Sequence, residues 1–236
     1  MESLDKQQLT LPVSLPVTFR FDEYVAGSNG EVLDYLRGLA NGVEYSTPVC
    51  YLAGKHGLGK THLLVATVEA ANSEGHNALY LDLESLVEQP KDVLLDLEQY
   101  QLICVDNVDS VQNNIDWQQA IFDLVNRVLE SNHQIVFAAT ALPKFLDIAL
   151  ADLVSRLEWG VLFKLQALPD ELLVEAIIAR AASKGLKMPV DSANYVIRHF
   201  RRDMKSLVAM LDLLDERSLQ TQRRLTIPFI KDELNI

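Results

Sequence analysis

The sequence has few cysteines, a shortage of basic residues and no long apolar run. Its two cysteines, Cys50 and Cys104, lie inside short apolar segments, PVCYLAG and LICVDN, which predicts buried, reduced thiols and argues against a disulfide or a metal site. Lys and Arg total 21 against 33 Asp and Glu, and the net charge of −12 disfavours tight, autonomous binding to nucleic acid. No segment has the roughly 20 consecutive apolar residues of a membrane span, and the start, MESLDKQQ, does not resemble a signal peptide. We therefore expect a cytoplasmic protein that does not associate with membranes.

The chain is organised as an N-terminal arm, an α/β domain and a helical domain. Pro12 and Pro16 interrupt any helix or central strand in residues 1–18, which predicts an extended arm. Residues 19–166 alternate between apolar strand-like segments and helix-like segments, which predicts a five-stranded parallel sheet sandwiched by helices. The predicted strands are 49–53, 78–83, 101–106, 134–140 and 161–165, and the predicted helices are 60–74, 93–100 and 115–131. From 167 to 236 the strands stop, and helices are expected at 170–185, 191–200 and 203–220.

The segment LAGKHGLGKTHLL contains a complete phosphate-binding motif, G-x-x-x-x-G-K-[ST], between a predicted strand and a predicted helix. Backbone N–H groups of the glycine-rich loop and the helix N-terminus attract phosphate. Lys60 would neutralise the β- and γ-phosphates, and Thr61 would ligate Mg²⁺. The expected nucleotide-binding residues are Gly54, His56, Gly57, Leu58, Gly59, Lys60, Thr61 and His62, although the side chain of His62 is expected chiefly to pack or cap.

The strand LICVDN would supply the acid that such a loop needs. Asp106 follows four apolar residues and is expected to hold Mg²⁺ through water. The next residue is Asn107, which can orient a water molecule but cannot accept its proton at neutral pH. Asp109 is an alternative base, but its pattern is more typical of an exposed turn carboxylate. The pocket is thus better suited to holding a nucleotide than to hydrolysing it quickly.

The order of these motifs resembles the bacterial replication initiator DnaA. TFRFDEYVAGSNGEVLDYL (18–36) is similar to its F-D-x-[FY]-V-x-G-x-N segment, GLGKTHLL (57–64) to its phosphate loop, and SRLEWG (155–160) to its S-R-F-x-W-G segment. The resemblance covers roughly residues 17–220 and implies an AAA+ P-loop NTPase fold, with the C-terminal helices as the lid.

Three further features resemble the Hda family of DnaA regulators. They are QLTLP near the start, RRLTIPFIKDEL (223–234), and an end at Ile236, where DnaA would continue into a DNA-reading helix-turn-helix domain. The resemblance implies a protein that binds ADP or ATP with Mg²⁺ and docks on the DNA-loaded sliding clamp, the β subunit of DNA polymerase III. Such a protein stimulates hydrolysis of DnaA-bound ATP and so limits initiation of replication. DNA would be contacted mainly through the clamp, and a homo-oligomer is possible.

The resemblance also assigns roles to single residues. Arg156 corresponds to the arginine finger that acts in trans, whereas the residues alone support a surface ion pair at a strand start equally well. Thr140 stands where DnaA carries an acid. Lys205 stands where the lid of DnaA carries a sensor arginine, so it is also expected to bind the nucleotide, as a point charge without a planar fork. Together with Asn107, these departures predict weak intrinsic ATPase activity.

The arm would carry the clamp-binding motif. Gln8 would hydrogen-bond at the rim of a pocket on the clamp, Leu9 and Leu11 would enter apolar hollows, and Pro12 would restrict the free backbone. The alternative is an arm that folds back onto its own domain.

Two other functional classes compete with the regulator. A small P-loop kinase needs an arginine-rich substrate lid, but residues 84–100 are acidic and apolar. A DnaA-type initiator or helicase loader needs direct duplex recognition, which the −12 charge disfavours. The basic run 198–205, with Arg198, Arg201 and Arg202, is a candidate contact for DnaA or DNA, but these residues are more typical of a solvated helix face.

Overall fold

The computed structural model describes residues 19–221 and 224–234 and separates into two compact units. The first unit contains Val32–Gly54 and Lys60–Lys164, with the described residues before Asp22. The second contains Asp22–Glu31, Lys55–Gly59 and the chain from Leu165 onward. The phosphate loop therefore contributes residues to both units.

A sheet of five parallel strands forms the centre of the first unit, in the order β2-β3-β4-β1-β5 among the described residues. Its inner strands are short and almost entirely buried, as expected for a parallel sheet covered on both faces. The strands are β1 (Val49–Ala53), β2 (Ala78–Asp82), β3 (Leu102–Asp106), β4 (Gln134–Ala139) and β5 (Val161–Lys164). This confirms the predicted fold class, with strand ends within one residue of those expected.

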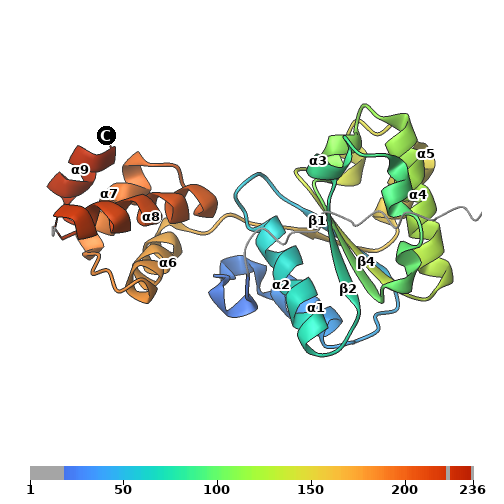
Figure 1. Ribbon diagram of the computed structural model, residues 1–236, viewed down its shortest axis with the longest axis horizontal. Helices are drawn as coiled ribbons and strands as arrows, with labels where there is room; N and C mark the ends of the chain where they lie inside the picture. The colour runs from blue at the N-terminus through green and yellow to red at the C-terminus, as the bar shows by residue number, and fades with distance from the viewer. Residues whose placement is uncertain (1–18, 222–223, 235–236) are drawn as a thin grey trace, which may run out of the picture. The chain divides into compact units, whose positions relative to one another are not determined.

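Helices cover both faces of this sheet (Figure 1). The register places Tyr80, Cys104, Val136 and Cys50 side by side on one face. Alternate strand residues face a second apolar core, which is completed by helices on the opposite side from α2. The helices with a role in this unit are α1 (Gly30–Ala40), α2 (Lys60–Ser73), α3 (Leu83–Leu86), α4 (Ile115–Glu130) and α5 (Ala151–Glu158).

The helix predicted at 93–100 is wrong. The chain forms two single 3₁₀ turns there, Lys91–Leu94 and Leu97–Gln99. Asp96 between them has a φ of 59°, in the left-handed region, which an α-helix cannot contain. The other 3₁₀ turns are Phe21–Glu23, Gly27–Asn29, Val108–Val111 and Pro143–Phe145.

The second unit is a helical bundle with its own apolar core (Figure 1). Its helices are α6 (Asp170–Ser183), α7 (Val190–His199), α8 (Met204–Thr221) and α9 (Ile227–Leu234). Asn29 ties the segment 22–31 to this unit, because its Nδ2 donates to the Gln166 carbonyl at 2.9 Å and its Oδ1 accepts from the Gln166 N–H at 2.8 Å. Phe229 and Leu214 are fully buried in the core, so α9 and α8 pack as parts of one domain. No helix in the described part of the chain is long and apolar enough to cross a membrane.

Candidate nucleotide site and the Arg156 helix

Lys60 and Thr61 stand at the first turn of α2, directly after the phosphate loop. The Lys60 side chain is only 7% exposed, and its Nζ donates to the Gly54 carbonyl at 2.6 Å. Burial lowers the pKa of Lys60, while the negative charges of Asp106 and Asp109 act in the opposite direction. The Gly54 N–H donates to the Ala139 carbonyl at 3.0 Å, which fixes the start of the loop against the end of β4.

Asp106, at the end of β3, is fully buried and accepts three hydrogen bonds. Thr61 Oγ1 donates to its Oδ2 at 2.5 Å, the Tyr80 hydroxyl donates to the same oxygen at 3.1 Å, and the Asn107 N–H donates to Oδ1 at 2.9 Å. Burial raises the pKa of the Asp106 carboxyl, and these bonds and the Lys60 charge oppose that rise. A carboxylate beside a threonine hydroxyl offers the oxygen ligands that Mg²⁺ prefers, so the pair predicted from the sequence fits that ion.

Asn107 is brought to the same edge of the sheet. Its backbone has a φ of 55°, and its side-chain Nδ2 donates to Asp82 Oδ1 at 2.8 Å. Asp82 ends β2, the strand next to β3. The Asn107 amide is therefore held in place by a neighbouring carboxylate, and it cannot act as a base.

The prediction that Asp109 is an exposed turn carboxylate is wrong. Its side chain accepts hydrogen bonds from Thr140, at 3.0 and 3.1 Å from the backbone N–H, and also from the Thr140 hydroxyl. Thr140 directly follows β4, and β3 and β4 are neighbours, so the sheet order brings the two residues together. A carboxylate thus stands beside the strand end where DnaA carries its acid, but it is supplied by residue 109.

In the second unit, two glycines of the phosphate loop are packed closely. Gly57 and Gly59 have φ values of 81° and 84°, which favour glycine. A Cβ on Gly57 would lie 2.2 Å from that of Asp203, and one on Gly59 would lie 2.7 Å from the Tyr24 ring. Tyr24 also donates to the Leu58 carbonyl at 3.4 Å. The glycines are therefore required by packing as well as by backbone conformation.

Arg156 lies on helix α5, so the alternative that placed it at a strand start is wrong. Its guanidinium carbon, Cζ, lies 5.6 Å from the ring centroid of Trp159 and 6.0 Å from that of Phe122 in α4. Within residues 19–221 and 224–234, Arg156 forms no ion pair. Arg127 on α4 differs, because it pairs with Glu98 at 3.1 Å and donates to the Leu94 carbonyl at 2.7 Å.

The remaining predicted site residues lie elsewhere or outside the described part. His56 is exposed on the loop. The His62 ring stacks on the Phe19 ring, with 4.6 Å between the two ring centroids, in agreement with a packing role. Lys205 lies in the first turn of α8, but its side chain is not among those described. The arm residues Gln8, Leu9, Leu11 and Pro12 also fall outside the described residues.

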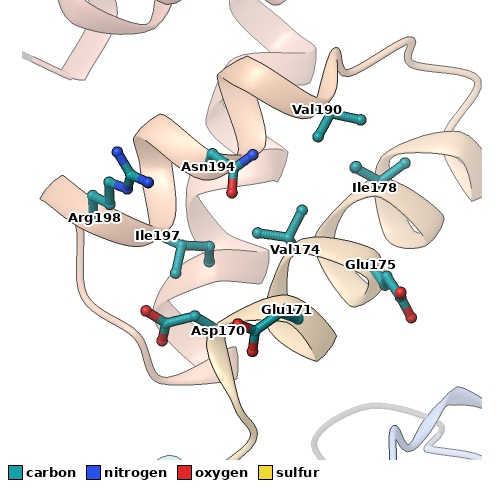
Figure 2. Close-up of a pocket in the computed structure, with 9 residues that line it drawn as sticks. All are labelled: Asp170, Glu171, Val174, Glu175, Ile178, Val190, Asn194, Ile197 and Arg198. Carbon is teal, nitrogen blue, oxygen red and sulfur yellow. The ribbon is translucent and has the colours of Figure 1, made fainter.

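The second unit has a groove of about 510 Å³ between α6 and α7 (Figure 2). Its floor is apolar, with Val174 and Ile197, and acidic residues line the α6 side. Arg198, one of the basic residues of the predicted helix face, lies at its edge. The groove contains none of the predicted nucleotide-binding residues.

A family model of the bacterial DnaA ATPase domain matches residues 15–164, well over half of the 236-residue chain. The chain belongs to the DnaA ATPase family. A second model, the lid domain of Hda, matches residues 170–234, so the chain is an Hda-like, DnaA-related AAA+ protein.

Solved structures agree on the fold. Domain III of Thermotoga maritima DnaA is 20% identical with a TM-score of 0.79, over 92% of this chain and 95% of that one. AMPPCP-bound DnaA from Aquifex aeolicus is 19% identical with a TM-score of 0.74, over 89% of this chain and 71% of that one. The Thermotoga maritima RuvB branch migration motor is 16% identical with a TM-score of 0.70, over 94% and 72%. At these identities the likeness supports a shared fold.

Proposed function

We propose that this protein is a negative regulator of replication initiation, which binds adenine nucleotide and stimulates hydrolysis of ATP held by DnaA. The observation that carries the proposal is the order of the two family matches, a DnaA ATPase domain followed by an Hda lid. The proposed domains are an arm at 1–18, a nucleotide-binding domain at 19–166 and a lid at 167–236.

Its own nucleotide would be bound by the cluster at the start of α2. Lys60 would bind the phosphates, and Thr61 with Asp106 would hold Mg²⁺, which would neutralise phosphate charge. Asn107 is an amide held by Asp82, so the cluster offers no base at the position after Asp106. We therefore propose tight binding and slow hydrolysis of ADP or ATP by the isolated protein.

Arg156 would act on the nucleotide of DnaA. The guanidinium contacts aromatic rings and pairs with no carboxylate in the described part of the chain, so its N–H donors suit a phosphate of another subunit. In other systems, such an arginine contributes about 10³–10⁵ in rate. Its position on a packed helix supports a role that needs a defined direction.

The N-terminal arm would bring the protein to the sliding clamp. Gln8, Leu9, Leu11 and Pro12 would bind as an extended segment, with the two leucines as apolar anchors. Burial of one leucine contributes roughly 1.5–3 kcal/mol, so the double variant Gln8→Ala/Leu11→Ala should weaken clamp binding by tens-fold or more. Surface plasmon resonance against immobilised clamp measures this loss. An unchanged affinity would mean that the arm does not dock there.

The experiment that tests the whole proposal measures hydrolysis of radiolabelled ATP bound to DnaA. The protein is assayed alone, then with DnaA, then with DnaA, clamp and DNA. We expect little turnover alone and the fastest turnover in the complete mixture. Turnover that is fast without DnaA would favour an independent ATPase, and a DnaA-bound ATP pool unchanged by the protein would exclude the regulator.

A further inference from the structure

Two aromatic rings lie close to the guanidinium of Arg156, and they come from different elements. Phe122 belongs to α4, and Trp159 directly follows α5. Both ring centroids lie within about 6 Å of Arg156 Cζ, the range of cation–π attraction. We call Phe122 and Trp159 the aromatic pair.

The backbone that carries Trp159 is held in place by buried contacts. Leu153 and Leu157 anchor α5 with both side chains fully buried, and the Trp159 N–H donates to the Arg156 carbonyl at 3.3 Å. The next residue, Gly160, is pressed against β1, because a Cβ there would lie 1.7 Å from the Val49 carbonyl oxygen. The backbone around Trp159 is thus fixed against the central sheet, although its side chain remains 54% exposed.

Aromatic neighbours suit an arginine that must donate hydrogen bonds to another molecule. A carboxylate partner would occupy the N–H donors of the guanidinium, as Glu98 does for Arg127. A ring face attracts the cation through its π-system and leaves the N–H edge available for a phosphate. Restricting the long arginine side chain before encounter also reduces the conformational entropy that is lost on binding.

We propose that Trp159 is a positioning residue for Arg156, and that Phe122 provides the second aromatic contact for the guanidinium. The inference rests on the proposed role of Arg156 as a finger acting on the ATP of DnaA. Trp159 does not contact that nucleotide in this account. It restricts the directions in which the guanidinium can point.

The expected effect on DnaA-bound ATP hydrolysis is moderate. Loss of one partly exposed cation–π contact corresponds to about a two- to fivefold lower maximal rate for Trp159→Leu. Trp159→Phe keeps an aromatic face and should retain most of that rate. A positioning role lowers kcat at saturating DnaA and leaves the apparent KM for DnaA unchanged, whereas direct docking of Trp159 on DnaA would raise KM.

A second measurement tests the contact between Arg156 and Trp159 in the absence of DnaA. Trp117 is buried and Trp159 is half exposed, so acrylamide quenching of tryptophan fluorescence reports mainly on Trp159. Removing the guanidinium in Arg156→Ala should uncover a ring face and raise the quenching constant, and Arg156→Lys should raise it less. Equal quenching in the wild type and Arg156→Ala would refute the contact between Arg156 and Trp159, even if Trp159→Leu fails to fold.

The outcomes separate the inference from the proposed function. If Arg156→Ala removes stimulation and Trp159→Leu retains the full rate, the positioning role of Trp159 is refuted, whereas the finger role of Arg156 is supported. If Arg156→Ala stimulates like the wild type, the finger fails and the positioning role of Trp159 fails with it, whereas the quenching experiment separately decides whether Arg156 covers the Trp159 ring. If Trp159→Leu and Trp159→Phe lose the same rate in proportion to their loss of melting temperature, Trp159 is structural and the inference fails.

Discussion

Replacement of Asp109 by alanine tests the most specific feature that the structure adds to the candidate site. The carboxylate accepts from the Thr140 N–H with both oxygens and also from the Thr140 hydroxyl. Asp109→Ala would leave both donors without this partner. An unsatisfied buried donor costs about 1–3 kcal/mol, and Thr140 is half-buried, so water would replace part of the loss. We expect the free energy of unfolding to fall by about 2 kcal/mol, or about 4–8 °C in Tm.

Urea unfolding followed by tryptophan fluorescence measures this change. Trp117 is buried in α4 of the first unit, which also contains Asp109. Asp116→Ala is the matched control, because the Asp116 side chain is 77% exposed and its ion pair with Lys91 is long at 3.7 Å. Because Asp116 also lies in the first turn of α4, where a negative charge favours the helix, the control should change stability by less than about 1 kcal/mol. A loss in Asp109→Ala no larger than in the control would refute the structural role of the Asp109–Thr140 contact.

Three further predictions concern other positions. Gly160→Ala should cost at least about 2 kcal/mol, because its Cβ would collide with the Val49 carbonyl, whereas Gly30→Ala meets nothing within 4 Å and should be near neutral in the same urea assay. Burial raises the pKa of Tyr24 from 10.0 to about 12, so the unfolded state releases this proton first and the free energy of unfolding falls as pH rises from 10 to 12. In urea titrations at pH 9.5 and 11, Tyr24→Phe should lose less stability than the wild type, and an equal loss would contradict the burial effect. Lys60→Ala should abolish the rise in Tm that adenine nucleotide gives the wild type, and equal thermal shifts would remove Lys60 from the nucleotide site.

The sheet and the start of the candidate nucleotide site could be predicted from the sequence, because both depend on local patterns. Short apolar runs such as LICVD identify buried strands, and the loop motif identifies Lys60 and Thr61. Asp106 follows from its place at a strand end. Its Tyr80 partner follows only from the pairing of β2 with β3, which a single sequence does not specify.

The features that were missed depend on long-range contacts or on backbone conformation. Asp109 looks like a turn residue until β4 brings Thr140 beside it. The predicted helix at 93–100 fails at Asp96, whose left-handed backbone is not evident from its residue type. Helix α5 buries only Leu153 and Leu157, too few apolar positions to reveal a helical period around Arg156.

In the proposed function, Arg156 accelerates hydrolysis of ATP on another protein. The most direct test is a single-turnover measurement with radiolabelled ATP bound to DnaA in the presence of clamp-loaded DNA. The wild type should convert the bound ATP to ADP, and Arg156→Ala should lower that rate by about 10³ or to the level of DnaA alone, with unchanged binding to the clamp. Arg156→Lys keeps the charge but loses the planar fork, and it should remain strongly impaired. Conversion by Arg156→Ala at the wild-type rate would contradict the account.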